Sequence, residues 1–471
     1  MTRRCRFLLA FFVIITGTLT THAITSSTIE AFDSRGRIEL PASKQRIGDA
    51  QRGRDYLING DYIKSGIPLE LYRVLQKNHS RNELGRAGES ATLPPYLTAI
   101  KAHNGRAIAS SNCLACHSQE LNGEFILGLG NTLRDFTGDN SAYAKKIDQL
   151  LSVTELADPK PREAYAAFRD ATLAVGPHIR TKVVGTNPAL KLALVLGAHR
   201  DPKTLSWSET PRFQLPPADE VIPSDVPAFW LLHKKNAMFH NGMGRGDFAR
   251  TMMASSLYTL RSIDEAEKID AHFVDVHAYI DTLRPPKYPN RIDTELLEHG
   301  EEIFSQRCAS CHGTYGKEWS YPNLLIHLDK IGTDPAMALN AQKQDATYGV
   351  TYKESWFGQG EHAGRLAPSP GYVAPPLDGI WATAPYLHNG SVPTLEALLD
   401  SSLRPRYWRR SFKQQDYDLE RVGWIYQEVE SGGHKHIYDT TLFGHSAEGH
   451  PYADKLDAEQ RRALLEYLKS L

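Results

Sequence analysis

Stretches of amphipathic helical pattern cover much of the chain. From Asp49 onward, apolar residues recur at a helical period. Further helical patterns span residues 141–156, 161–175 and 188–197. A proline-rich loop, Pro211 to Pro227, ends this series. The pattern predicts a mainly α fold with loop insertions, preceded by a polar, extended N-terminal extension over residues 24–48.

Two similar stretches are each expected to lie on an amphipathic helix that closes a domain. Residues 277–283 resemble residues 465–471, and both helices are expected to begin at a capping box. The two boxes pair Ser262 with Glu265 and Asp457 with Gln460. Prolines at 285, 286 and 289 would stop the first of these helices. We therefore predict two domains, residues 49–286 with a helical insertion and residues 287–471.

The N-terminus has the pattern of a secretory signal peptide. Arg3, Arg4 and Arg6 precede an apolar run over residues 7–15, and small residues near Ala23 offer a cleavage site. We expect residues 1–23 to be removed and the protein to be periplasmic or secreted. The alternative is an uncleaved anchor, although the run is short for a membrane span of about 20 residues. After cleavage we expect no stable membrane span.

The charge balance is close to neutral. The chain has 54 Lys+Arg, 55 Asp+Glu and a formal net charge of −1. Loss of the leader removes three arginines and no acids, which leaves a charge of about −4. This balance indicates no nucleic-acid partner. Cys5 lies in the leader, so four cysteines remain for chemistry.

Those four cysteines form two copies of a Cys-x-x-Cys-His motif. The copies are Cys113, Cys116 and His117, and then Cys308, Cys311 and His312. Two thiols at this spacing can form thioethers to one porphyrin, and the next residue supplies the proximal imidazole. A zinc site or a redox-active thiol pair is the competing interpretation of Cys-x-x-Cys alone. The repeated histidine favours two covalently bound c-type haems.

A repeat ahead of each motif suggests similar local structure. Gly105 and Ile108 precede the first motif at the spacing by which Gly300 and Ile303 precede the second. We therefore expect each haem motif to end a similar helix.

The sixth iron ligand separates an electron-transfer haem from a reactive one. His450 lies in a glycine-rich loop before the last predicted helix, so we predict a bis-histidine iron with His312 and His450 as ligands. A surface histidine is the alternative for His450, and His445 lies slightly earlier in the same loop. The first domain has no equally placed histidine; Met252 and Met253 are its nearest soft ligands. The first iron is therefore the candidate for the reactive site.

Two His-Asn-Gly triplets, at His240 and His388, are candidates for lining a haem pocket. Asn-Gly is also a common turn pair, so a simple turn is the alternative. Phe239 could wall an apolar pocket, and Trp381 could bridge two haems, although most tryptophans are core. We name His240, Phe239, Trp381 and His388 as candidate catalytic residues.

These motifs together resemble the bacterial di-haem cytochrome c peroxidase superfamily, most closely its di-haem rubber oxygenase-like branch. The resemblance rests on both Cys-x-x-Cys-His motifs and on four further stretches. These are residues 384–395, Lys234 to Phe239, Gly244-Arg245-Gly246-Asp247, and Gly449-His450-x-Tyr452. It implies a bis-histidine relay at the C-terminal haem and an open, oxygen-binding position at the N-terminal haem, where His117 is the proximal ligand.

The resemblance implies an oxidoreductase that activates peroxide or dioxygen. His240 departs from the family pattern, and a histidine there could ligate iron or transfer protons, so the choice of oxidant stays open. The partners would be a small redox donor or acceptor, such as a cytochrome c or cupredoxin, or a small or apolar substrate. The alternatives are an oxygenase that cleaves an unsaturated apolar substrate and a plain electron carrier. A calcium ion between the domains also stays open.

Overall fold

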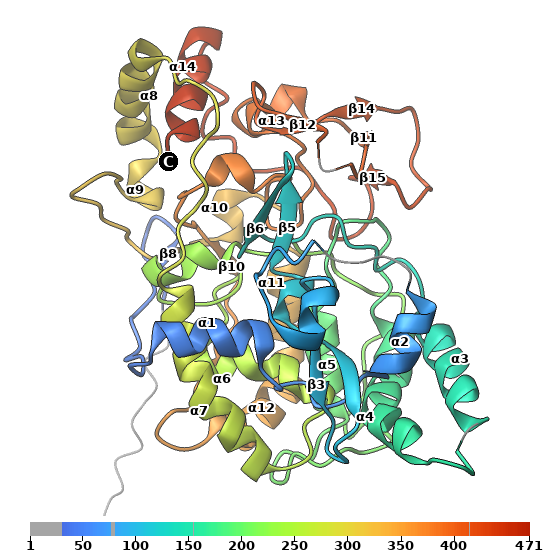
Figure 1. Ribbon diagram of the computed structural model, residues 1–471. Coiled ribbons are helices and arrows are strands. Elements are labelled where there is room, and N and C mark those ends of the chain that lie inside the picture. Colours follow the sequence, from blue (N-terminus) through green and yellow to red (C-terminus); the bar gives the residue numbers. More distant parts are fainter. Residues whose placement is uncertain (1–30, 77–80, 154, 414) are drawn as a thin grey trace, which may run out of the picture.

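The computed structural model describes residues 31–76, 81–153, 155–413 and 415–471 (Figure 1). The predicted signal peptide therefore lies outside the described residues. The chain is 39% helical and 14% strand, with many small sheets. The prediction of a mainly α fold is wrong, because short strands of two to five residues show almost no period in the sequence.

Two helix pairs pack closely. Helix α1 (Ala50–Asn59) contacts α7 (Ile263–Ile280), and α8 (Thr294–Arg307) contacts α14 (Ala458–Lys469), as Figure 1 shows. Both closing helices begin at the predicted caps: Ser262 accepts from the Glu265 amide, and Asp457 and Gln460 form a complete capping box. The two helix pairs thus repeat one packing arrangement.

Glycine allows the helices of each pair to come close together. A Cβ on Gly53 of α1 would collide with the backbone of Asp275, and a Cβ on Gly300 of α8 would collide with the backbone of Ala463. Gly53 is therefore the structural counterpart of Gly300. Gly105, which the sequence repeat paired with Gly300, instead lies in a hairpin turn with a φ of +80°.

A strand, not a helix, leads into the first haem motif. Strand β4 (Ala107–Ser111) pairs with β2 (Ile67–Pro68) and β3 (Leu97–Lys101), and Cys113 follows at once in the short helix η2 (Cys113–Ala115). The second motif follows α8 directly and lies in α9 (Ala309–His312). The expectation of two similar helices ahead of the motifs is therefore wrong for the first motif.

Helices lie at the three segments where the sequence predicts them: α3 (Ser141–Ser152), α4 (Lys160–Val175) and α5 (Ala189–Ala198). Their interpretation as an insertion in a haem domain stays a prediction. The other α-helices are α2 (Leu69–Leu75), α6 (Phe248–Met252), α10 (Leu328–Ile331), α11 (Ala336–Gln344), α12 (Val350–Glu354) and α13 (Leu395–Leu399). Among the helices that the structure describes, none is long and apolar enough to cross a membrane.

The remaining sheets are small and antiparallel. Their strands are β1 (Arg37–Glu39), β5 (Ser118–Leu121), β6 (Glu124–Leu127), β7 (Gly244–Gly246), β8 (Leu324–His327), β9 (Gly364–Leu366), β10 (Gly371–Val373), β11 (Tyr407–Arg410), β12 (Tyr417–Asp418), β13 (Gly423–Trp424), β14 (Tyr426–Glu428) and β15 (Ile437–Asp439). Two of these sheets join the halves of the chain, because β1 pairs with β8 and β7 pairs with β9.

The hydrophobic core also crosses the expected domain boundary. The largest N-terminal cluster contains residues of α1, α5 and α7, and also Tyr348, Tyr352 and Phe357 from the second half. The C-terminal cluster includes Phe304, Leu464 and Trp381. The division at residues 286 and 287 stays a prediction, because the two halves share sheets and one core cluster.

Candidate functional site: two cysteine–histidine motifs and two His-Asn-Gly turns

His312 is held from one side by a backbone carbonyl. Its Nδ1–H donates to the carbonyl of Pro375 at 2.7 Å. A metal-ligating histidine typically donates its other ring N–H in this way, which fixes the ring and makes the ligating nitrogen more basic. The Nε2 atom of His312 is therefore the one left for a metal.

His450 lies opposite His312. The ring centroids are 6.2 Å apart and the ring planes meet at 62°. Two imidazole nitrogens that share one iron at bond lengths of about 2 Å place their ring centres about 6 Å apart. The separation of these rings therefore fits one iron between them, which is the arrangement predicted for His312 and His450.

The backbone conformation of the loop that carries His450 places this residue beside α10. Gly449 and His450 have φ values of +82° and +53°, and the His450 amide donates to the Ile331 carbonyl at 2.8 Å. Burial lowers the pKa of His450 to about 3 and also lowers the pKa of His312. Both rings are neutral at pH 7, the form that binds a metal.

His117 has a comparable proximal setting but a different neighbour. Burial lowers the pKa of His117 to about 4, and the nearby Pro227 carbonyl opposes this shift in part. The Nδ1 atom of His117 is buried and has no hydrogen-bond partner among the described residues. The ring stacks on Phe229, with centroids 3.9 Å apart and planes at 18°. Among the described residues, no second histidine ring contacts the ring of His117.

All four motif cysteines are free thiols and partly buried. Asn187 Nδ2 donates to Cys116 Sγ at 3.5 Å, and Cys113 Sγ lies 3.8 Å from Ser255 Oγ. Burial raises the pKa of Cys308 to about 11. These residues fit a covalent haem. Each motif presents two unpaired thiols and one histidine whose pKa is lowered by burial.

The structure reveals a repeat around the two His-Asn-Gly triplets. The same spacing separates Pro227 from His240 and Pro375 from His388. In both copies the residue before the histidine has a positive φ, 69° at Phe239 and 65° at Leu387. Each triplet lies in a turn that is closed by an isolated antiparallel β-bridge. The bridge joins Met238 to Gly244 in the first copy and Tyr386 to Val392 in the second.

The two turns are joined through backbone segments that precede the prolines. The Asp225 amide donates to the His388 carbonyl at 2.7 Å, and the Val373 amide donates to the His240 carbonyl at 2.8 Å. Asp225 lies two residues before Pro227, and Val373 lies two residues before Pro375. Each proline segment is therefore bound to the turn of the other repeat.

Three of the four candidate catalytic residues, His240, His388 and Phe239, lie on the two His-Asn-Gly turns. His240 Nε2 lies 3.0 Å from the Asp225 carbonyl, and burial lowers its pKa to about 4. His388 stacks on Tyr372 with ring centroids 4.0 Å apart, and burial lowers its pKa well below the usual value. Phe239 is 42% exposed. The turns thus bring His240 and His388 near each other, with Phe239 beside His240 on the same turn.

Trp381 lies in the C-terminal core cluster. It is 4% exposed, its Nε1–H donates to the Pro286 carbonyl at 2.9 Å, and its ring packs edge-on against Tyr288. Met253, one of the methionines weighed as a soft ligand, is fully buried in the N-terminal core cluster. Packing alone accounts for both side chains.

Asn389 belongs to the second His-Asn-Gly triplet, but its contacts were not predicted from the sequence. It is fully buried, and its Nδ2 donates to the carbonyls of Gly444 at 3.1 Å and Ser446 at 3.0 Å. Both carbonyls belong to the loop that carries His450. The sequence does not show this contact. Only the fold brings Asn389 to the loop that carries His450.

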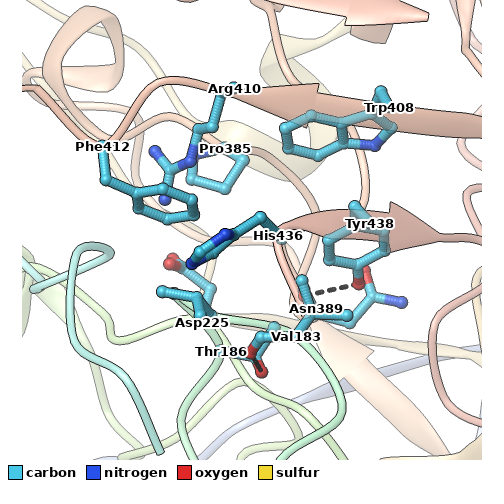
Figure 2. Close-up of a pocket in the computed structure, with 13 residues that line it drawn as sticks. Val183, Thr186, Asp225, Pro385, Asn389, Trp408, Arg410, Phe412, His436 and Tyr438 are labelled. Atoms are coloured by element: carbon cyan, nitrogen blue, oxygen red, sulfur yellow. Dashed lines mark hydrogen bonds between the residues drawn. The ribbon is translucent and has the colours of Figure 1, made fainter. Parts of the chain in front are cut away.

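Asp225 and Arg410 also escaped the sequence analysis. Figure 2 shows Asp225 in a small cavity beneath Pro385 and Arg410, where Tyr438 donates to the Asn389 carbonyl at 2.9 Å. Burial raises the pKa of Asp225 well above its usual value, and Arg410 partly opposes this rise. Burial lowers the pKa of Arg410 to about 9. Within the described ranges, no group of three His, Cys, Asp or Glu side chains could hold a metal ion, and we assign no calcium site.

Comparison with known proteins gives one family match and uncharacterised relatives. Residues 371–409, which include Pro375 and the second His-Asn-Gly turn, match a family described as RoxA-like, cytochrome c-like. Uncharacterized protein y4iJ of Sinorhizobium fredii (strain NBRC 101917 / NGR234) is 30% identical over 253 residues, which cover 40% of this chain and 41% of that protein. Uncharacterized protein y4iM of the same strain is 28% identical over 316 residues, 58% of this chain and 70% of that protein.

The chain thus spans less than half of the first relative's length. Its residues 371–409 are similar to a cytochrome c-like domain, and this similarity implies a haem iron cofactor and a cytochrome or oxidoreductase class of protein.

Proposed function

We propose that this chain is a di-haem c-type cytochrome that acts as an oxidoreductase. In this proposal peroxide or dioxygen is activated at the N-terminal site, and the C-terminal site relays electrons. The observation that carries the proposal is the pairing of His312 with His450, because among the described residues no second imidazole is paired with His117 in this way. One iron would have two protein ligands and the other would have one.

The C-terminal residues support a relay role. Two neutral imidazoles that face each other would hold one iron from both sides, which would leave no place for a small oxidant. The Pro375 carbonyl fixes His312, and the amides of Asn389 fix the His450 loop. Rigid ligands reduce the structural change that accompanies electron transfer, so this site suits repeated oxidation and reduction.

The N-terminal residues support a reactive role. His117 supplies one axial nitrogen, and the apolar Phe229 ring supports the imidazole without competing for iron. Cys113 and Cys116 would carry the thioether links. Bound haem would supply the redox chemistry, and the chain would supply the proximal ligand and an apolar surrounding.

Two other functions stay as alternatives. The family match at residues 371–409 is RoxA-like, which favours an oxygenase that cleaves an unsaturated apolar substrate over an unrelated haem enzyme. A plain electron carrier would require a strong second ligand for the first iron. We also propose a periplasmic or secreted location, with a small cytochrome c or cupredoxin as redox partner.

Spectroscopy with carbon monoxide tests the proposal. We expect one low-spin haem that does not bind CO and one haem that does, in optical and EPR spectra of the oxidised and reduced protein. Two low-spin, CO-silent haems would contradict an enzyme. A turnover assay then separates the reactions: hydrogen peroxide with reduced cytochrome c for a peroxidase, and dioxygen with a polyisoprenoid for an oxygenase.

A further inference from the structure

Helix α3 and the turn that follows it expose apolar side chains to solvent. Leu150 on the helix is 51% exposed, Val153 just beyond the helix is 82% exposed, and Leu156 in the turn is fully exposed. A surface helix usually directs polar side chains outward, and neighbouring exposed apolar residues mark an interaction surface. This segment is therefore a candidate for contact with another molecule.

The exposed residues continue the apolar face of α3 beyond the part that the protein covers. Ile147 and Leu151 point inward and pack with Tyr165 in one buried cluster. Tyr143, which is 48% exposed, lies seven residues before Leu150, so these two side chains share one side of the helix. The apolar arc of α3 is thus wider than its packing on the protein requires.

Positive charge lies beside this apolar face. Lys145 and Lys146 are both exposed, and within the described residues neither ammonium group belongs to an ion pair. The acids of the helix and of the turn are already paired: Asp148 pairs with Arg162 at 2.9 Å, and Glu155 pairs with the same arginine. The charge that remains available on α3 is therefore that of the two lysines.

We infer that this face of α3 docks on a lipid bilayer that contains anionic phospholipid. The α3 surface consists of Tyr143, Lys145, Lys146, Leu150, Val153 and Leu156. Its apolar side chains insert among the lipid headgroups, and its two ammonium groups contact the phosphates. Lysine favours lipid over a protein partner, because lysine is depleted from the cores of protein interfaces but typical of membrane-surface helices.

The position of α3 leaves the C-terminal site accessible. Figure 1 shows α3 at the edge of the molecule, on the side opposite α8 and α14. His312 follows α8, and His450 precedes α14. A protein that is held at a membrane through α3 therefore keeps its C-terminal site open to a redox partner. The inference goes beyond the proposed function, because it assigns a docking surface and does not depend on the reaction.

Co-sedimentation with vesicles tests the inference. The mature, haem-loaded protein is mixed with vesicles of phosphatidylglycerol and phosphatidylcholine in equal parts, and with vesicles of phosphatidylcholine alone. We expect binding to the mixed vesicles to be about tenfold tighter, because two lysines are attracted to the anionic surface. Mass spectrometry first confirms that residues 1–23 are absent, since an apolar leader would itself bind lipid.

A double variant tests the apolar contribution. Leu150→Ser with Leu156→Ser should weaken binding to the mixed vesicles by about tenfold or more, because two exposed leucines no longer insert. The matched control is Ile47→Ser with Ile425→Ser, which removes two side chains that are 99% and 53% exposed on other segments. This control should bind within about twofold of the unmodified protein.

A second double variant tests the charge. Lys145→Gln with Lys146→Gln should remove the preference for the mixed vesicles over phosphatidylcholine alone. If the leucine variant does not fold, this lysine variant decides the question, and an unchanged preference would overturn the inference.

The remaining outcomes are also decisive. The inference is wrong if the unmodified protein does not bind the mixed vesicles, or if the leucine variant binds them equally well with unchanged haem content and melting temperature. Self-association that the leucine variant abolishes, without vesicle binding, would assign the α3 surface to a second copy of the chain and not to lipid. Haem content and CO spectra test the proposed function separately, so either proposal can fail alone.

Discussion

The rings of His312 and His450 lie 6.2 Å apart, at the separation that two ligands of one iron require. These residues come from opposite ends of the C-terminal half, one following α8 and the other preceding α14. The packing of α8 on α14 brings them together, and the Pro375 carbonyl and Asn389 fix them there. The fold therefore holds these two imidazoles in an arrangement that fits the proposed iron site.

Removal of His450 should open the C-terminal iron. We expect His450→Ala to convert the CO-silent haem to one that binds CO, because the variant loses one of two axial nitrogens. Optical CO titration would show one additional binding haem per chain. His445→Ala is the matched control: His445 is buried in the same loop, and its Nδ1 bonds to the Phe443 carbonyl. CO binding equal in both variants would contradict the assignment of His450.

Gly449 should be intolerant of any side chain. Its φ is +82°, and a Cβ would collide with the backbone at Gly332, so Gly449→Ala must move the His450 loop. We expect loss of the bis-histidine spectrum and a lower melting temperature. Gly433→Ala is the control, because Gly433 has a φ of +93° but open space around it. It should cost only about 1–2 kcal/mol and keep the spectrum.

The buried His240 predicts a loss of stability in acid. Burial lowers its pKa in the folded protein from 6.5 to about 4. Because the unfolded chain then binds the proton first, this contribution to stability is complete above pH 6.5 and is lost as the pH falls toward 4. His240→Gln should reduce the drop in unfolding free energy between pH 7 and pH 4.5 by about 2 kcal/mol.

Denaturant unfolding at both pH values measures this effect. His299→Gln, at an exposed position on α8, is the control and should leave the drop unchanged. An equal drop in both variants would show that His240 is not held as a neutral ring.

The sequence predicted the long helices, whereas haem attachment at both Cys-x-x-Cys-His motifs stays a prediction. Amphipathic period and capping residues located α7, α14 and the three insertion helices, because these features are local. The strands were missed for the same reason. β4 has five residues, and its pairing with β2 and β3 depends on distant segments. The Gly105 repeat was misleading, since the counterpart of Gly300 is Gly53, which the helix packing alone identifies.

The site itself was predictable only where chemistry is encoded in consecutive residues. His117 and His312 follow cysteine pairs, so a role as iron ligands could be predicted for them directly. Asp225 and Asn389 act through hydrogen bonds to segments far away in the chain, and no local pattern marks them. Their contributions depend on tertiary contacts that sequence period does not describe.

The central claim is that two haems are covalently attached through the four motif cysteines. Mass spectrometry of the purified, denatured protein, together with the alkaline pyridine spectrum, measures this directly. We predict two haems per chain, and one haem per chain when Cys113 and Cys116 are both replaced by alanine. Recovery of apoprotein, or of haem that dissociates on denaturation, would contradict the account.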